Sequence, residues 1–191
     1  THCNYMNIME ETRVVNSNVE LNRTKSLTMN SELHTTYDEW VLYAHYSHVK
    51  EWNLDSYTRI HNINTLEDMI CLNKYLPKEL ITNCMLFIMR QDIKPIWEDK
   101  ENKNGGCFSY KVPNHLAENT WKTLSYFLIS ENISSDIEFM SKVNGMTISP
   151  KKHFCILKLW LKDCSYETNE KIDCFISDEF SKLNCIFKKH V

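Results

Sequence analysis

Residues 93–110 read Ile-Lys-Pro-Ile-Trp-Glu-Asp-Lys-Glu-Asn-Lys-Asn-Gly-Gly-Cys-Phe-Ser-Tyr. Pro95 fixes its own φ angle and favours extended geometry in the residue before it, so the residues that follow are predicted to form a rigid corner rather than a helix. The Gly105-Gly106 pair predicts a tight reversal of the chain. Residues 107–112 are predicted to form a β-strand, because they alternate and are rich in aromatic and β-branched types.

Trp97 and Glu98 are neighbours in this predicted corner. An indole on a polar loop is costly to leave in water, and a carboxylate beside it cannot join a core. The pair therefore indicates a stacking face with a hydrogen-bond acceptor next to it. Such a pair suits a flat cationic ring that carries N–H donors on one edge.

The segment resembles the signature loop of the eukaryotic translation initiation factor 4E family, whose members bind the cap of messenger RNA. The similarity runs from about Trp40 to the C-terminus. It is supported by further blocks in the family's order, namely Asp-Glu-Trp-Val-Leu-Tyr at 38–43, Asn-Thr-Leu-Glu-Asp at 64–68, Thr-Trp-Lys-Thr-Leu at 120–124 and Ile-Leu-Lys-Leu-Trp at 156–160. Several ordered blocks are more specific than one motif, so the sequence is identified as a divergent member of this family.

Length and composition limit the classes of protein that fit. The 191 residues suffice for one sizeable core and are too few for two full domains. A net charge of −3 excludes a nucleic-acid binder coated in Lys and Arg, so RNA contact is expected at one local site. No apolar run approaches the roughly 20 residues that span a bilayer.

The eight Cys include no Cys-x-x-Cys pair, which indicates reduced thiols in a cytoplasmic protein. Scarce Ala, Gly and Arg fit an AT-rich genome, such as that of a protist or a large DNA virus, in which case the cytoplasm is that of the host cell.

The hydrophobic pattern predicts one α+β domain. Residues 1–37 are polar and are expected to form a flexible or loosely packed arm, which leaves 38–191 as the cap-binding domain. Periodicity predicts strands at 40–46, 57–63, 83–90, 107–112, 145–149, 153–161 and 184–188, and helices at 64–75, 115–130, 135–142 and 166–183. The resemblance implies a curved antiparallel sheet of about eight strands, with three helices on its convex face and the cap slot on its concave side.

Trp52, Trp97 and Glu98 correspond to the family's residues for the cap base. The resemblance implies that the two indoles sandwich the 7-methylguanine ring, whose positive charge attracts them by cation–π interaction. Glu98 would accept hydrogen bonds from the N1–H and the 2-amino group of the base. The alternatives are that both Trp are ordinary core aromatics and that Glu98 is a solvated loop carboxylate.

Trp160 is placed by strand parity. Residues 155, 157, 159 and 161 form one apolar face, so Trp160 and Lys158 share the other face. A Trp that shares a face with a Lys is expected at a ligand rim rather than deep in the core, although a core role is the alternative. Its family counterpart touches the N7 methyl group of the cap.

Lys151, Lys152 and Lys158 are the candidates for the cap phosphates, because phosphate recognition needs cations at the mouth of the slot. The alternative is an ordinary solvated basic turn. Lys151 aligns with a phosphate-binding Arg of the family. Ile156 and Cys107 stand where the family has a phosphate-binding Lys and a further Arg, so the phosphate site is altered, with Lys158 as the substitute cation.

His34, Leu66, Ile70 and Tyr126 are assigned to a scaffold-binding surface. The family binds a Tyr-x-x-x-x-Leu-hydrophobic motif through a His-Pro-Leu segment, a Val and a Trp of its first helix. The corresponding positions here hold His34-Thr-Thr, Leu66 and Ile70, so the indole N–H donor is missing. The alternative for the two apolar residues is a core role.

The expected function is non-enzymatic binding of the 7-methylguanosine cap of messenger RNA, without a cofactor, together with recruitment of a scaffold subunit for translation initiation. A cap-binding repressor of translation is the nearest alternative. A cap-processing enzyme is disfavoured, because the sequence has no clustered Glu motif, no closely spaced His triplet and no nucleophile–base signature. His45-x-x-His48 lacks partners at zinc-like spacing, so no metal is expected. A protein-interaction module that has lost the ligand is a further alternative.

Overall fold

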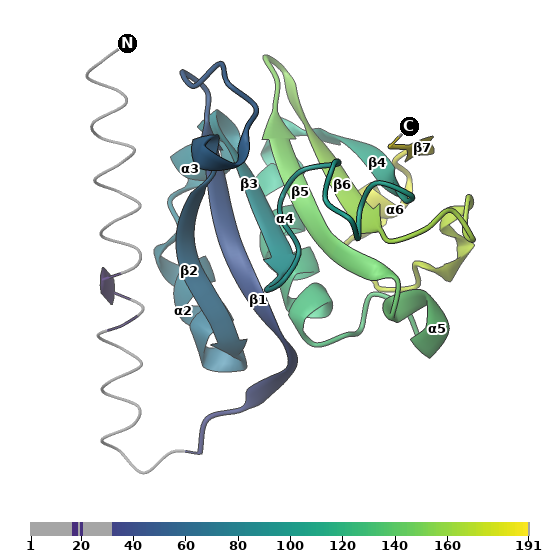
Figure 1. Ribbon diagram of the computed structural model, residues 1–191, viewed down its shortest axis with the longest axis horizontal. Helices are drawn as coiled ribbons and strands as arrows, with labels where there is room; N and C mark the ends of the chain where they lie inside the picture. Colours follow the sequence, from purple (N-terminus) through teal and green to yellow (C-terminus); the bar gives the residue numbers. More distant parts are fainter. Residues whose placement is uncertain (1–16, 19, 21–31, 191) are drawn as a thin grey trace.

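The computed structural model describes residues 17–18, 20 and 32–190, and it has an α+β fold built on one curved, open sheet (Figure 1). Among the described residues the sheet has seven strands in the order β2-β1-β3-β5-β6-β4-β7, and every pairing is antiparallel. The resemblance had implied about eight strands. The strands are β1 (Thr35–Tyr46), β2 (Thr58–Thr65), β3 (Cys84–Arg90), β4 (Gly106–Pro113), β5 (Val143–Pro150), β6 (Phe154–Leu161) and β7 (Cys185–Lys189).

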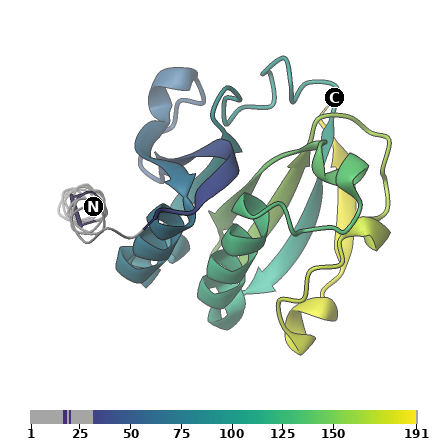
Figure 2. The ribbon, with the colours of Figure 1, turned by 90° about the horizontal axis from the view of Figure 1, so that it is seen from below.

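Helices pack on one side of the sheet and bury the main core against it (Figure 2). The helices are α2 (Leu66–Tyr75), α3 (Lys78–Asn83), α4 (Asn114–Ile129), α5 (Ile137–Met140) and α6 (Asp178–Ser181), with 3-10 turns η1 (Leu54–Ser56) and η2 (Asn169–Lys171). α2 begins where the sequence predicts, because Thr65 and Asp68 form a capping box in which each side chain accepts a hydrogen bond from the other's backbone N–H. The largest fully buried side chains of this core include Trp40, Trp121 and Phe108.

The predicted helix at 166–183 is wrong, since only η2 and α6 are helical in that stretch. The backbone N–H groups of Asp173 and Cys174 both donate to the carbonyl of Ile133, so the chain is bonded to a distant loop instead of to its own preceding turn. Helix α3 was not predicted. Pro77 marks the end of α2, but its φ of −63° also suits the start of a helix, and α3 begins directly after it.

The opposite side of the sheet carries a second, smaller apolar cluster and is called the open face below. Its members are Val41 and Tyr43 from β1, Phe87 and Met89 from β3, Trp160 from β6, and Ile93 from the segment after β3. The loops 47–57 and 91–105 lie on this side, away from α2 and α4 (Figures 1 and 2). The predicted binding residues of both loops are therefore on one face.

The predicted arm at 1–37 lies mostly outside the described residues, and it stays a prediction. β1 begins at Thr35, five residues before the predicted first strand. Seven of the eight Cys are described, and none of these seven forms a disulfide with another described residue, while Cys3 lies outside the described residues. No helix in the described part of the chain is long and apolar enough to cross a membrane. The described part also contains no group of three or more His, Cys, Asp or Glu placed to hold a metal ion.

Candidate ligand-binding site

The loop between β3 and β4 carries Trp97 and Glu98, and buried Asn102 holds it in shape. Asn102 is 0% exposed, and its Nδ2 donates to the carbonyl oxygens of Lys94 at 3.0 Å and Ile96 at 2.8 Å. Its Oδ1 accepts a hydrogen bond of 2.9 Å from Nδ2 of Asn144 on β5. The segment that presents the indole is therefore fixed to the sheet by buried polar contacts.

Asp99 closes the same loop from the other side. Its carboxylate accepts hydrogen bonds from the N–H groups of Lys94 at 3.0 Å and Glu101 at 2.9 Å. Its backbone carbonyl accepts from the N–H groups of Asn102 and Lys103. The corner predicted after Pro95 is thus a series of hydrogen-bonded turns without helix.

Gly105 and Gly106 are not the tight reversal that was predicted. Neither residue has a positive φ angle, and Gly106 is the first residue of β4. A Cβ atom on Gly105 would lie 1.8 Å from the carbonyl oxygen of Leu161, and one on Gly106 would lie 2.5 Å from Cζ of Phe187. The two glycines are needed because neighbouring backbone and an aromatic ring come too close for any side chain.

Trp52 lies in the loop between β1 and β2 and is 59% exposed. Its indole stacks on the ring of His45, with 4.1 Å between ring centroids and an interplanar angle of 5°. Nε2 of His45 is 2.9 Å from the carbonyl oxygen of Glu51, so this nitrogen carries the proton and donates. The indole is therefore held from below while its other face is open to solvent.

Tyr57 connects this loop with the Trp97 loop. Its ring meets His45 edge-on at 5.1 Å and Phe87 of the open face at 5.3 Å. Burial, together with the negative charge of Glu98, raises the pKa of Tyr57 to about 12. Glu98 is thus close enough to Tyr57 to act on it electrostatically.

Both predicted sandwich residues are on the surface, because Trp97 is 53% exposed and Trp52 is 59% exposed. The alternative that they are core aromatics is wrong. Glu98 is exposed and is adjacent to Trp97, as a ligand-accepting carboxylate needs to be. The chain thus presents two uncovered indoles and a free-standing carboxylate on the open face.

Strand parity placed Trp160 correctly, since residues 155, 157, 159 and 161 join the main core while Trp160 lies in the cluster of the open face. Trp160 is only 7% exposed, and its Nε1–H donates to Oγ1 of Thr147 at 2.8 Å. It therefore lies buried in the floor of the open face, within its apolar cluster, rather than at the exposed rim that was expected, so the core alternative holds in part.

His190, which was not predicted, joins the floor to the Trp97 loop. Its ring centroid is 4.8 Å from that of Trp160, its Nδ1 is 2.7 Å from the carbonyl oxygen of Asn102, and its N–H donates to the carbonyl of Gly105 at 3.0 Å. Burial lowers the pKa of His190 below its ordinary value of 6.5, and the nearby charge of Lys158 lowers it further. This side chain is neutral at physiological pH, which suits its role as a hydrogen-bond donor within the protein.

The three predicted phosphate ligands are not equivalent. Lys158 is half-buried on β6, where it pairs with Thr147 of β5 and Ser109 of β4 and shares the face of Trp160. Lys151 and Lys152 are exposed in the turn between β5 and β6. Within residues 32–190 none of the three pairs with a carboxylate. Lys158 lies in the site itself, whereas the other two lie at the tip of the hairpin.

The residues assigned to the scaffold surface lie in the segment before β1, on α2 and on α4. The His34 carbonyl accepts from the N–H of Leu66 at 2.8 Å, and Nδ1 of His34 is 2.8 Å from Oε1 of Glu67. Ile70 is 53% exposed on α2, and Tyr126 is 39% exposed on α4. Leu66 is partly buried against the main core, so the core alternative holds in part for Leu66 and is wrong for Ile70.

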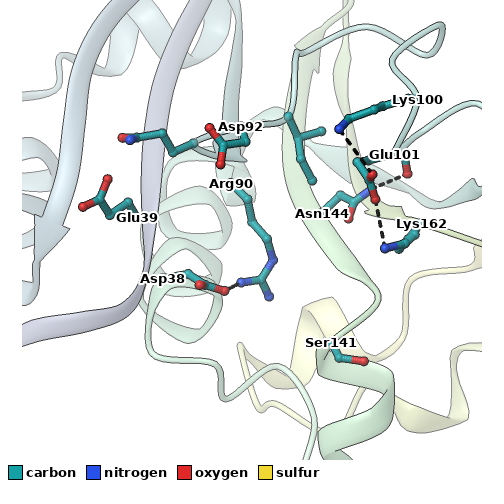
Figure 3. A pocket seen from close by; sticks show the side chains of 11 residues that line it. Asp38, Glu39, Arg90, Asp92, Lys100, Glu101, Ser141, Asn144 and Lys162 are labelled. Atoms are coloured by element: carbon teal, nitrogen blue, oxygen red, sulfur yellow. Dashed lines mark hydrogen bonds and ion pairs between the residues drawn. The ribbon is translucent and has the colours of Figure 1, made fainter.

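A separate polar cleft of about 440 Å³ lies between β1, the end of β3 and the Trp97 loop. Arg90 forms ion pairs with Asp38 and, at 3.0 Å, with Glu131. Figure 3 shows Lys100 and Lys162 directed at Glu101, and Nζ of Lys162 is 2.9 Å from Oε2 of that residue. These ion pairs join neighbouring segments across the cleft, which Glu39 and Asp92 also line.

Comparisons with known proteins agree with the fold. The family model of eukaryotic initiation factor 4E matches residues 32–190. The eukaryotic translation initiation factor 4E homolog of Acanthamoeba polyphaga mimivirus is 40% identical over 62 residues, which are 32% of this chain and 23% of that protein. Eukaryotic translation initiation factor 4E of Eremothecium gossypii is 26% identical over 146 residues, 74% of this chain and 67% of that protein. This chain therefore spans about a quarter of the viral relative and about two thirds of the fungal one.

Two solved structures have the same fold. A complex of C. elegans eIF4E-3 with the 4E-binding protein Mextli and a cap analog has a TM-score of 0.64 at 19% identity, covering 74% of this chain and 80% of that chain. Schistosome eIF4E complexed with m7GpppG and 4E-BP has a TM-score of 0.65 at 23% identity, covering 72% and 76%.

Proposed function

This chain belongs to the eukaryotic initiation factor 4E family, and on that basis we propose that it binds the 7-methylguanosine cap of messenger RNA and recruits a scaffold protein for translation initiation. The observation that carries the proposal is that two indoles and a carboxylate are exposed on the two loops of the open face, whose apolar cluster contains Trp160. The related structures hold a cap analog or m7GpppG together with a 4E-binding protein. Family members are initiation factors rather than enzymes, so no reaction is proposed. The expected site of action is the cytoplasm, that of a host cell if the gene is viral.

Selectivity for the methylated base follows from its charge. Methylation at N7 makes the guanine ring cationic, and Trp52 and Trp97 each contribute about 1–2 kcal/mol to its binding once water is excluded. Glu98 accepts hydrogen bonds from N1–H and the 2-amino group, an edge that only guanine offers. Such charge-assisted bonds contribute about 1.5–3 kcal/mol. Lys158 lies beside Trp160 and is the nearest of the predicted cations to the base, with Lys151 and Lys152 reaching the outer phosphates.

A titration of tryptophan fluorescence tests this proposal. We expect 7-methyl-GTP to quench the wild-type protein strongly, and GTP to quench it weakly because it lacks the positive ring. Glu98→Ala should raise the dissociation constant for 7-methyl-GTP about 10- to 100-fold, from the loss of the charge-assisted bonds.

Asp92→Asn is the matched control, since Asp92 is an exposed carboxylate of the same loop outside the predicted slot. It should leave the 7-methyl-GTP affinity unchanged. Equal quenching by 7-methyl-GTP and GTP, or an equal loss in both variants, would contradict the proposed slot and favour an interaction module without cap binding.

Repression of translation is the second candidate, because the scaffold surface departs from the family's pattern. The exposed large apolar residue on α2 is Ile70, which offers apolar area but no side-chain N–H donor. A pull-down on immobilised 7-methyl-GTP distinguishes the two roles. Recovery of a scaffold that carries a helicase, abolished by Ile70→Asp, supports initiation, whereas a cap-bound protein without that scaffold supports repression.

A further inference from the structure

The open face beyond Trp160 carries a row of cations on three adjacent strands. Trp160 of β6 pairs with Cys107 of β4, which pairs in turn with Lys188 of β7. Because paired residues of antiparallel strands point to the same side, Lys188 shares the face of Trp160. The same register places Lys158 opposite Ser109, and Lys111 two residues further along β4 on that face.

We call Lys158, Lys111 and Lys188 the basic strip. The chain as a whole has 25 acidic and 22 basic residues, yet the positions of β4, β6 and β7 that face this side include no acidic residue: Cys107, Ser109, Lys111, Phe154, Ile156, Lys158, Trp160, Ile186 and Lys188. Lys111 and Lys188 are exposed, and neither forms an ion pair within residues 32–190. The strip therefore concentrates positive charge on one face of an acidic protein.

Lys189 shows the contrast within a single strand. It follows Lys188 directly, and strand alternation sends its side chain to the other side of β7. There its Nζ is 2.9 Å from Oε1 of Glu167. Of these two adjacent lysines, Lys189 on the helical side is neutralised by a carboxylate, whereas Lys188 on the open face has no such ion pair within residues 32–190.

Apolar surface accompanies the cations of the strip. The ammonium of Lys111 lies 4.4 Å from the centroid of the Phe154 ring, and Ile186 is 59% exposed. Proteins that bind single-stranded nucleic acid without reading its sequence combine such backbone-tracking cations with exposed rings or apolar side chains that contact bases.

We propose that the basic strip binds the sugar–phosphate backbone of the RNA nucleotides that follow the cap. This inference rests on the proposed function, since the strip begins at Trp160 in the floor of the slot and leads away from it. Lys158 and Lys188 stand two strands apart and are offset by two residues along the strands, a backbone separation of about 12 Å, so the strip extends beyond a single phosphate group. RNA is favoured over an acidic protein segment because the strip continues directly from the slot.

The test compares three probes by fluorescence titration: 7-methyl-GTP, a capped ten-nucleotide RNA, and the same RNA without a cap. We expect the capped RNA to bind several-fold more tightly than 7-methyl-GTP at low salt. That advantage should fall as salt is added. A plot of the logarithm of the association constant against the logarithm of the salt concentration should steepen by about 0.7 for each phosphate neutralised on a single strand. The double variant Lys111→Gln, Lys188→Gln should lose most of the advantage and the associated slope while its affinity for 7-methyl-GTP stays unchanged.

Lys189→Gln is the control, because it removes the same charge from the neighbouring residue on the opposite face. The strip would be overturned if the wild-type protein bound capped RNA and 7-methyl-GTP with equal affinity. It would also be overturned if the double variant and Lys189→Gln lowered the affinity for capped RNA by the same factor. Binding of a polyglutamate chain as tight as that of uncapped RNA of equal charge would overturn its assignment to RNA. If 7-methyl-GTP failed to bind, the cap proposal would fail. Even in that case the strip would be supported if the double variant lost binding of uncapped RNA and the Lys189→Gln variant kept it.

Discussion

The two loops that present the exposed tryptophans are held in very different ways. The Trp97 loop is bound through the buried amide of Asn102 to its own backbone and to Asn144 of β5, and through His190 to the C-terminal end of the chain. The Trp52 loop is held mainly by the stacking of the indole on His45 and by the hydrogen bond from His45 to the carbonyl of Glu51. One wall of the proposed slot is held by a buried polar network, and the other by aromatic contacts of His45 with Trp52 and Tyr57 and by the hydrogen-bonded turn between Asn53 and Ser56.

This difference assigns different tasks to the two walls. A carboxylate that must meet two N–H groups at once needs a fixed position, and the network around Asn102 provides it for Glu98. Stacking tolerates sliding in the plane of the ring, so Trp52 needs only a platform beneath it. The loss of conformational freedom on binding should therefore fall mostly on the Trp52 loop. Substitutions in the two loops can test this division directly.

Asn102→Ala should have the largest effect on stability. It leaves the carbonyls of Lys94 and Ile96 without their donor, and a buried polar group left unpaired costs about 1–3 kcal/mol. We expect the free energy of unfolding, measured by urea denaturation, to fall by about 2–4 kcal/mol, with weaker quenching by 7-methyl-GTP. Lys103→Ala, at an exposed position of the same loop, is the control. A loss no larger than that of the control would show that the network does not hold this wall.

His45→Ala should have a smaller effect on stability, about 1–2 kcal/mol, because it removes one aromatic stack and one hydrogen bond. The emission of Trp52 should shift to longer wavelength as the indole loses its platform. His45→Phe keeps a ring beneath the indole and loses only the bond to Glu51, so it should retain most of the 7-methyl-GTP affinity. If Phe were as damaging as Ala, the hydrogen bond rather than the stack would hold the Trp52 wall.

The sequence predicted those parts of the fold that depend on neighbouring residues. Strand alternation placed Trp160 on the face opposite the main core, and the helix predicted over 64–75 is α2. The stretch 166–183 failed because its backbone is bonded to Ile133, a contact that no local pattern records. Local periodicity could not reveal that long-range pairing had displaced helix formation.

The predicted site shows the same limit. Trp52, Trp97 and Glu98 stand out as candidates, because an indole in a polar loop is anomalous in the sequence itself, and their role in ligand binding stays a prediction. The residues that support them carry no such signal. His190 meets Asn102 across 88 positions of sequence, and Lys188 reaches the face of Trp160 only through the register of three strands. The residues that contact a ligand can stand out in a sequence, whereas those that position them emerge only from the fold.

Protonation of His190 should have the smallest of these effects on the Trp97 loop. It should change the free energy of unfolding by less than about 1 kcal/mol as the pH is varied. Burial puts its pKa in the folded protein below 6.5, so at pH values between the folded and unfolded pKa the unfolded chain binds more protons. Stability should therefore fall as the pH drops below about 6.5, and this loss is complete below the folded pKa. His190→Gln removes the titration while keeping a donor for the Asn102 carbonyl. As the pH is lowered from 7.5 to 5.5, the unfolding free energy of the wild-type protein should fall by more than that of this variant. Parallel pH curves would mean that protonation at His190 does not loosen the Trp97 wall, and the contrast between the walls would then rest on Asn102 alone.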